Sequence, residues 1–521
     1  MADHARSFAP RELIDKMARV GAREVKSSYL LTALVAFLCI DNLLLWRFLN
    51  FAPWWLYLLG IGLAVAACAA FSKIVGRWAA GGPTVCCLAV CAGVALILYL
   101  LGGQGRLFYA NVDWQVRDAV LRDMTIHSWP FAYTARAVPE ILRAPIGMYL
   151  VPALAGKSFG PAAADVALLA QNALLLTILL GLASSLFRST RIRLVALAVF
   201  LAFSGMDVIG QFLSGETGGG PDSDHLEQWA SIQFSSHITQ AFWVPQHALA
   251  GWYGAVLYLL WSQRRIPVVA LFVLLPLMAL WSPLGLLGAL PFAVYAGLRT
   301  IAERGICFAD AAVAVLATAL TLPALLYLAA AGSSVGFRIF QITPNSYFLF
   351  QALEALPFLL AVALLGGRNR FGGMTLVLVG ACLMIMPFWQ IGENVDFMMR
   401  SSIPALAILS VQVIEALCTD EYKNTGLRFF AKGVLVATLL VGSVTGAVEI
   451  RRSIINLPSP RPKCSFFGAW DQSYSAFGKS TYLAPIWSIP SPIRPPHVTI
   501  VPAADPRRCY DRPWKAPRAL A

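Results

Sequence analysis

Long apolar stretches alternate with short polar segments over most of the 521-residue chain. An apolar run of about 20 residues is long enough for a helix to cross the hydrocarbon core of a bilayer. Runs of this kind, some of them short, lie at 29–49, 52–71, 83–102, 164–186, 192–213, 247–261, 267–281, 283–298, 309–331, 347–366, 372–391, 400–418 and 429–448. The pattern predicts an all-α polytopic membrane protein with about 13 (11–13) transmembrane helices over residues 29–448.

The composition agrees with this class. The chain is 58% hydrophobic and 13% charged, whereas soluble domains are roughly 45–50% apolar and about 25% charged. The net charge of +13 does not predict nucleic-acid binding, because much of it lies in short loops, where Lys and Arg set membrane topology. The sequence has no Walker motif, no GxGxxG unit and no Cys/His zinc spacing, so no soluble nucleotide-dependent domain is expected.

The short basic loops all fall on one side of the membrane if the N-terminus is cytoplasmic. Basic residues are concentrated in cytoplasmic loops, so this agreement predicts the orientation. The longer loops 103–163, 214–246, 332–346 and 392–399 then lie on the outer side. The loops assigned to the inner side carry Lys73 and Arg77; Arg188, Arg191 and Arg193; Arg264 and Arg265; Arg299 and Arg304; Arg368 and Arg370; and Lys423 and Arg428.

The two ends of the chain differ from the apolar middle. Residues 1–28 mix charges with apolar residues at helical spacing, which predicts a cytoplasmic amphipathic segment rather than a signal peptide. Residues 449–521 are rich in proline, serine and aromatic residues, which predicts a small extended cap on the outer side. Cys464 and Cys509 lie in this tail, and the sequence leaves open whether they form a disulfide.

The first outer loop contains the charged segment "NVDWQVRDAVLRDMTIHSWP" at 111–130. Its apolar residues recur at helical spacing, and the pairs Asp113–Arg117 and Asp118–Arg122 are each four residues apart. This predicts an exposed amphipathic helix lying flat on the outer surface, with its tryptophans at headgroup depth. One interpretation is a structural interface helix; the other is that Asp113 faces a cavity as a general base, with Arg117 beside it.

Two further outer segments carry candidate chemistry. In "WVPQHALAGW", Gln246 and His247 open directly into an apolar run, where polar groups usually face the protein interior or a water-filled cavity. The preceding "DSDH" has the spacing of a metal clamp, but a solvated loop is the better interpretation of Asp222 and Asp224. His247 is either a site residue or a hydrogen-bonded core histidine.

The segment "QIGENVDFMMRSSIPALAIL" (390–409) places Glu393, Asp396 and Arg400 at the outer mouth of a late apolar run. Asp396 and Arg400 are four residues apart and could simply stabilise a helix start. Alternatively, Arg400 binds a phosphate near the headgroup plane, because a guanidinium can donate two hydrogen bonds to phosphate oxygens. Asp41 lies within the first apolar run and is expected to point inward, because a charged group facing lipid is costly.

Together, these three segments resemble bacterial polytopic glycosyltransferases of the GT-C class, which use polyprenyl-phosphate-linked sugars. The likeness covers roughly residues 100–410. It consists of an acidic residue on a helix in a large outer loop, a later run opening with "WVPQHALAGW", and "GENVDFMMRSSIPAL" near the last runs. The sequence departs from the family pattern because the acidic loop follows the third apolar run rather than the first.

The resemblance implies a multi-pass protein of the bacterial inner membrane with an active site facing the periplasm. A polyprenyl-phosphate-linked sugar would be the donor, and a glycan or lipid the acceptor. By this analogy Asp113 deprotonates the acceptor hydroxyl, Arg400 holds the leaving phosphate, and Arg117, Gln246, His247 and Asp396 bind substrate. No cofactor is implied with certainty, and a requirement for a divalent metal stays open.

Three other functions remain as alternatives. An O-antigen-type polymerase or ligase would also use prenyl-linked sugars, but its active loop is expected late in the chain and rich in Arg and His. A lipid or solute transporter would have charged residues near the midplane of several spans, together with an internal repeat. The third alternative is a non-enzymatic assembly subunit. Because the titratable residues crowd on the outer side, a transferase is the function that the sequence favours.

Overall fold

The computed structural model describes most of the chain. It covers residues 20–51, 53–78, 81–134, 138–215, 225–330, 335–366, 370–392, 395–418, 426–473, 482–501 and 505–518. The predicted amphipathic N-terminal segment falls largely on residues 1–19 and lies outside the described residues, as do Asp222, Asp224 and Glu393.

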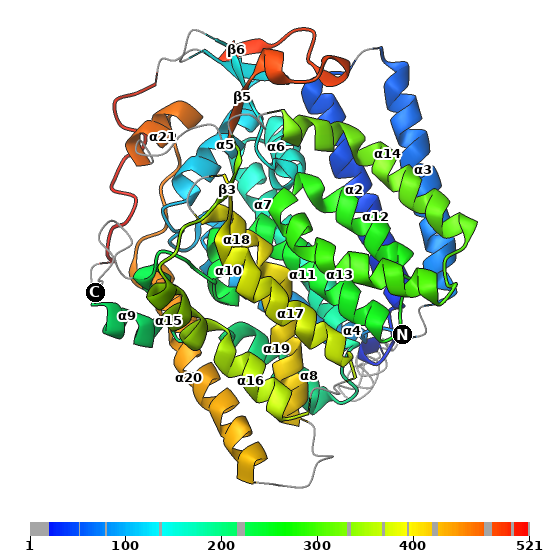
Figure 1. Cartoon of the computed structure of the whole chain (residues 1–521). Coiled ribbons are helices and arrows are strands. Elements are labelled where there is room, and N and C mark those ends of the chain that lie inside the picture. The colour runs from blue at the N-terminus through cyan, green and yellow to red at the C-terminus, as the bar shows by residue number, and fades with distance from the viewer. Residues whose placement is uncertain are drawn as a thin grey trace, which may run out of the picture.

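The described chain is predominantly helical, and each apolar stretch expected to cross the membrane contains helix (Figure 1). The helices of the first half are α2 (Ser27–Leu49), α3 (Trp55–Gly76), α4 (Val85–Leu101), α5 (Trp114–Ile126), α6 (Gly147–Phe159), α7 (Pro161–Ser184), α8 (Thr190–Ala202), α9 (Asp207–Ser214), α10 (His237–Trp243) and α11 (Pro245–Ser262). Those of the second half are α12 (Val269–Leu277), α13 (Pro283–Ala302), α14 (Phe308–Ala329), α15 (Pro344–Glu354), α16 (Leu356–Leu364), α17 (Gly373–Ile385), α18 (Asp396–Ser401), α19 (Ile403–Cys418), α20 (Gly426–Ile455) and α21 (Phe466–Ser473). Short 3₁₀ turns lie at η1 (Gln104–Arg106), η2 (Leu226–Trp229), η3 (Met278–Leu280), η4 (Met386–Phe388), η6 (Ile486–Ser488) and η7 (Ser491–Ile493).

Seven described helices or helix pairs are long and apolar enough to cross a membrane, or eight if the bent pair α15–α16 counts as one span. The two halves of that pair meet at an angle of 52°, because Pro357 has no backbone N–H to continue the helical hydrogen bonds across the break at Ala355. Other predicted runs form shorter apolar helices, namely Val85–Leu101, Val269–Leu280, Gly373–Phe388 and Ile403–Cys418. The protein is therefore a helical membrane protein, with fewer full-length candidate spans than the thirteen apolar runs predict.

Two small sheets accompany the helices, although the sequence predicts an all-α protein. One has four strands in the order β5-β2-β1-β6, and the other pairs β3 with β4. Strands of three residues are too short to show an alternating pattern, which explains why the sequence does not reveal them. Their bounds are β1 (Phe131–Tyr133), β2 (Glu140–Leu142), β3 (Phe337–Ile339), β4 (Trp389–Ile391), β5 (Leu483–Pro485) and β6 (Thr499–Val501).

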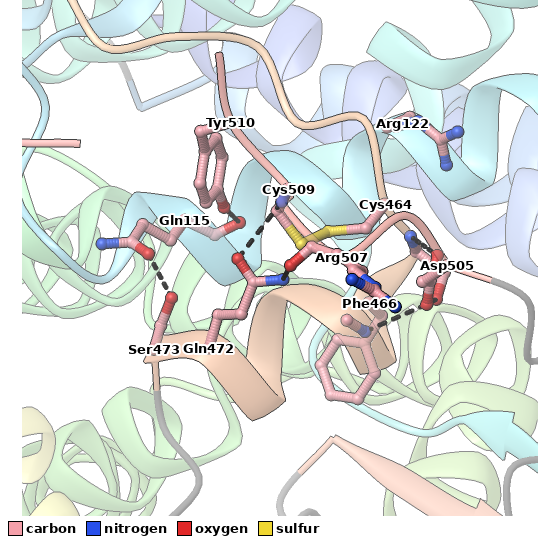
Figure 2. The surroundings of a disulfide bond; sticks show 12 residues. Gln115, Arg122, Cys464, Phe466, Gln472, Ser473, Asp505, Arg507, Cys509 and Tyr510 are labelled. Atoms are coloured by element: carbon pink, nitrogen blue, oxygen red, sulfur yellow. Dashed lines mark hydrogen bonds between the residues drawn. A yellow bond between two sulfur atoms is a disulfide. The ribbon is translucent and has the colours of Figure 1, made fainter. Parts of the chain in front are cut away.

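The C-terminal tail contributes β5, β6 and α21 and lies along one side of the bundle (Figure 1). A disulfide joins Cys464 and Cys509, whose Cα atoms are 4.9 Å apart, so the pairing that the sequence leaves open is present (Figure 2). Ala119 of α5 belongs to the same small apolar cluster as both cysteines. The predicted cap is thus closely attached to the first outer loop, because β5 and β6 join β2 and β1 in one sheet.

α5 is buried, and the prediction of an exposed helix lying flat on the surface is wrong. Trp114 is 2% exposed, and its indole N–H donates a hydrogen bond of 2.8 Å to the carbonyl oxygen of Phe242. Asp118 forms its ion pair with Arg106 (Nη1–Oδ2, 3.1 Å) rather than with Arg122. The helix is buried because α6, α7 and the tail helix α21 pack around it.

Candidate functional site

A cavity of about 430 Å³ brings together most of the candidate residues predicted from sequence. Its wall is formed by α5, α6, α11, α13, α14, α18 and the tail residue Tyr482. Five of the six predicted site residues line it: Arg117, Gln246, His247, Asp396 and Arg400. These residues come from three segments far apart in the sequence, so the fold itself assembles the site.

Arg117 contacts both Gln246 and Asp113. Its Nη1 donates a hydrogen bond of 2.7 Å to Oε1 of Gln246, and its Nη2 lies 3.4 Å from Oδ2 of Asp113. The predicted Asp113–Arg117 pair is therefore present. Asp113 immediately precedes the first residue of α5, and its side chain is 25% exposed. Asp113 does not itself line the cavity but touches a residue that does.

Asp396 and Arg400 lie on α18, the short helix that follows β4. Arg400 Nη1 and Asp396 Oδ1 are 2.5 Å apart, so the predicted i,i+4 ion pair is present. Both side chains also line the cavity, and Arg400 is 13% exposed. The ion pair is consistent with a site role because it fixes the guanidinium at the cavity wall.

His247 has the features of both interpretations made from the sequence. Its Nδ1 lies 2.7 Å from Oγ of Ser282, and the same hydroxyl caps α13 by accepting a hydrogen bond from the N–H of Gly285. The imidazole is hydrogen-bonded and 7% exposed, yet it lines the cavity. It therefore connects α11 to the start of α13 beside the site.

Sequence reasoning did not identify Arg143, Tyr149 and Tyr482, which also line the cavity. The backbone N–H of Arg143 donates a hydrogen bond of 2.7 Å to the carbonyl oxygen of Tyr482, extending the pairing of β2 with β5. Burial lowers the pKa of Arg143. Burial raises the pKa of Tyr482, and the positive charge of Arg117 lowers that pKa by a smaller amount. A tail residue of this kind carries no local signal that it lies beside a loop more than 300 positions away.

The cavity combines cationic groups with an apolar wall. Arg117, Arg143 and Arg400 contribute three guanidinium groups, whereas Asp396 is the carboxylate among the lining residues. The apolar wall comes mainly from α13 and α14, where Leu287 and Ala329 are both exposed at the bundle surface. This arrangement suits an amphiphilic anion with a phosphate at the arginines and a hydrocarbon chain along the leucines.

The part of the chain that the structure describes contains no group of three or more His, Cys, Asp or Glu side chains that could hold a metal ion. The predicted weak clamp at Asp222 and Asp224 lies outside that part.

A second polar cluster is buried beside the site, between the second outer loop and α20. His225 Nδ1 lies 2.8 Å from Oε1 of Glu449, and Arg452 forms an ion pair with the same glutamate. Although burial alone lowers the pKa of His225, the Glu449 carboxylate raises it above its usual value. Glu449 thus contacts both His225 and Arg452, which gives the cluster a structural role in holding His225 to α20.

Asp41 of α2 lies inside the helix bundle rather than facing lipid. It is fully buried, and its Oδ2 accepts a hydrogen bond of 2.6 Å from the indole N–H of Trp281. The expectation that Asp41 points inward is confirmed.

Comparisons with known proteins add no relative: no family model, no curated protein and no solved structure matches this chain.

Proposed function

We propose that the protein is a membrane glycosyltransferase whose outer cavity binds a polyprenyl-phosphate-linked sugar and transfers the sugar to a hydroxyl of a glycan or lipid acceptor. The observation that carries the proposal is the meeting of Arg117, Arg143 and Arg400 with a leucine-rich wall in one cavity. A phosphate bound by guanidinium groups and a prenyl chain along α13 and α14 would fill both parts of it.

The chemical step requires few protein groups. The acceptor oxygen attacks the anomeric carbon and loses its proton to a carboxylate, while the bond between that carbon and the phosphate oxygen breaks. The bonding electrons leave with polyprenyl phosphate, whose growing negative charge the arginines stabilise. Phosphate is a good leaving group, so positioning and cationic stabilisation supply most of the catalysis.

Asp113 is the proposed general base, and Asp396 is the alternative. Asp113 is partly exposed and is held near the cavity through Arg117, whereas Asp396 lines the cavity directly but is paired with Arg400. A base must lie within hydrogen-bond reach of the acceptor hydroxyl, directly or through one water. Asp113 lies at the start of α5 and Asp396 lies on α18, so replacing one carboxylate at a time separates their roles.

The proposed orientation places the N-terminus in the cytoplasm, all thirteen apolar runs within the membrane region, and the cavity at the periplasmic face of a bacterial inner membrane. The positive inner loops favour this orientation. The disulfide between Cys464 and Cys509 also favours it, since disulfides persist in oxidising compartments and the tail borders the cavity.

The test is release of polyprenyl phosphate from radiolabelled polyprenyl-phosphate sugars by the purified protein in liposomes, with acceptor glycans present. We expect release by the wild type and its loss in Asp113→Asn, while Asp511→Asn, which changes an exposed carboxylate on the tail, retains it. Loss in Asp396→Asn alone would transfer the base role to Asp396. Movement of the intact donor across the bilayer without release would contradict the transferase and support a transporter.

A further inference from the structure

A second cavity lies further along α11, the helix whose first turn, with Gln246 and His247, lines the outer cavity. It has a volume of about 230 Å³ and is enclosed by α4, α7, α8, α11 and α19. Its lining is largely apolar and comes from the first turns of α4, the last turns of α7, most of α8, and the facing residues of α11 and α19. The basic loops assigned to the cytoplasmic side adjoin these helix ends, so this cavity belongs to the inner half of the bundle.

The cavity opens to the bundle surface between α4 and α8. Four of its lining residues, Cys86, Val90, Thr190 and Leu194, are exposed. Val90 and Leu194 are large apolar side chains, 48% and 56% exposed. In a membrane protein such residues face lipid, so a hydrocarbon chain could enter from the side without crossing the protein.

Positive charge gathers at the mouth of this cavity. Arg193 lines it, and its Nε donates a hydrogen bond of 3.1 Å to the carbonyl oxygen of Phe187. Burial lowers the pKa of Arg265, and the positive charges of Arg188 and Arg193 act in the same direction. The repulsion between them favours a bound anion.

The nearby carboxylate does not neutralise this group. Glu415 forms its ion pair with Arg370, with Nε and Oε2 3.0 Å apart. Among the described residues, no carboxylate forms an ion pair with Arg188, Arg193 or Arg265. Arg191, the exposed second residue of α8, adds a further positive charge to this segment.

We infer that this inner cavity binds one acyl chain of an anionic phospholipid of the cytoplasmic leaflet, with the lipid phosphate at Arg193. A basic pocket between membrane helices on the cytoplasmic side is suited to an anionic headgroup, and each methylene buried in an apolar cavity adds favourable transfer free energy. The inference concerns a cavity with no residue in common with the outer site, so it does not rest on the proposed glycosyltransferase function.

The test is titration of the detergent-purified full-length protein with phosphatidylglycerol or phosphatidylcholine carrying the same acyl chains, with bound lipids counted by native mass spectrometry. We expect tighter binding of phosphatidylglycerol, and about fivefold weaker binding of it by Arg193→Gln. Arg77→Gln is the matched control, because Arg77 is an exposed arginine of another inner loop that does not line the cavity. Ala183→Phe, which places a ring in the cavity but leaves the charges unchanged, is expected to abolish tight binding.

Three results would overturn the inference. The first is equal affinity for the two phospholipids, and the second is equal affinity of Arg193→Gln and Arg77→Gln for phosphatidylglycerol. The third is tighter binding of undecaprenyl phosphate than of phosphatidylglycerol at this cavity, which would assign it to a different lipid. If Ala183→Phe fails to fold, as judged by its elution profile, the two arginine variants still decide the matter.

Discussion

Arg117 on α5 donates a hydrogen bond of 2.7 Å to the side-chain oxygen of Gln246 at the start of α11, although 129 positions separate the two residues. Both side chains are buried and both line the outer cavity. The contact joins α5 to α11, which begins at Pro245 within "WVPQHALAGW". It also leaves the second guanidinium nitrogen, Nη2, directed at Asp113.

Gln246→Ala is expected to weaken donor turnover by positioning Arg117 less well. A hydrogen bond to a charged group contributes about 1.5–3 kcal/mol, which corresponds to a loss of roughly 10- to 150-fold in kcat/KM. This loss in kcat/KM is measured by following turnover of the prenyl-linked donor. Gln412→Ala, at a buried glutamine of α19 that does not line the cavity, serves as the control. Equal effects of the two variants would show that Gln246 only supports the fold.

Opening the disulfide is expected to loosen the tail and displace Tyr482 from the cavity. The bond closes a loop of 45 residues, and removing a bond of this kind typically costs about 2–4 kcal/mol. Cys464→Ser should therefore lower the thermal midpoint and make residues after 456 easier to cleave with protease. Cys382→Ser, which changes a free buried cysteine of α17, is the matched control. Unchanged protease resistance of the tail in Cys464→Ser would contradict this account.

The structure predicts that acidification from pH 7 to pH 5 stabilises the attachment of the tail to α5. Asp123 is fully buried, and its Oδ2 accepts hydrogen bonds from the hydroxyl of Tyr133 and the N–H of Phe466. Burial raises the pKa of Asp123 to about 6. The folded state therefore binds this proton more tightly than the unfolded chain does, whose carboxyl titrates near 3.9.

The direction of this pH dependence follows from the difference in proton binding between the folded and unfolded states. Between about pH 4 and pH 6 the folded state holds the proton and the unfolded chain loses it, so the free energy of unfolding falls as the pH rises, by up to about 1.4 kcal/mol per pH unit. Thermal midpoints at pH 5, 6 and 7 should thus fall more steeply in the wild type than in Asp123→Asn. Parallel pH profiles for the two proteins would show that Asp123 does not titrate in this window.

Much of the site's local structure could be predicted from the sequence, because it depends on spacing within single helices. The pairs Asp113–Arg117 and Asp396–Arg400 are ion pairs four residues apart, as the helical repeat predicts. The place of Gln246 at the start of a helix is local in the same sense.

What could not be predicted depends on contacts between distant segments. The tail covers α5 through α21, and the exposed face expected for that helix is buried as a result. Arg143 and Tyr482 meet through one backbone hydrogen bond between the residue after β2 and the residue before β5. Hydrophobic periodicity reports which face of a helix is apolar, but not which partner covers the polar face.

The central claim is that the outer cavity binds a prenyl-linked phosphate, and equilibrium binding of polyprenyl phosphate to the protein in lipid nanodiscs tests it most directly. We expect Arg400→Gln to bind at least tenfold more weakly than the wild type, because one charge-assisted contact to phosphate is lost. Arg299→Gln, at an exposed arginine that is paired with Glu303 and does not line the cavity, should bind as the wild type does. Equal affinity of Arg400→Gln and the wild type would contradict the claim.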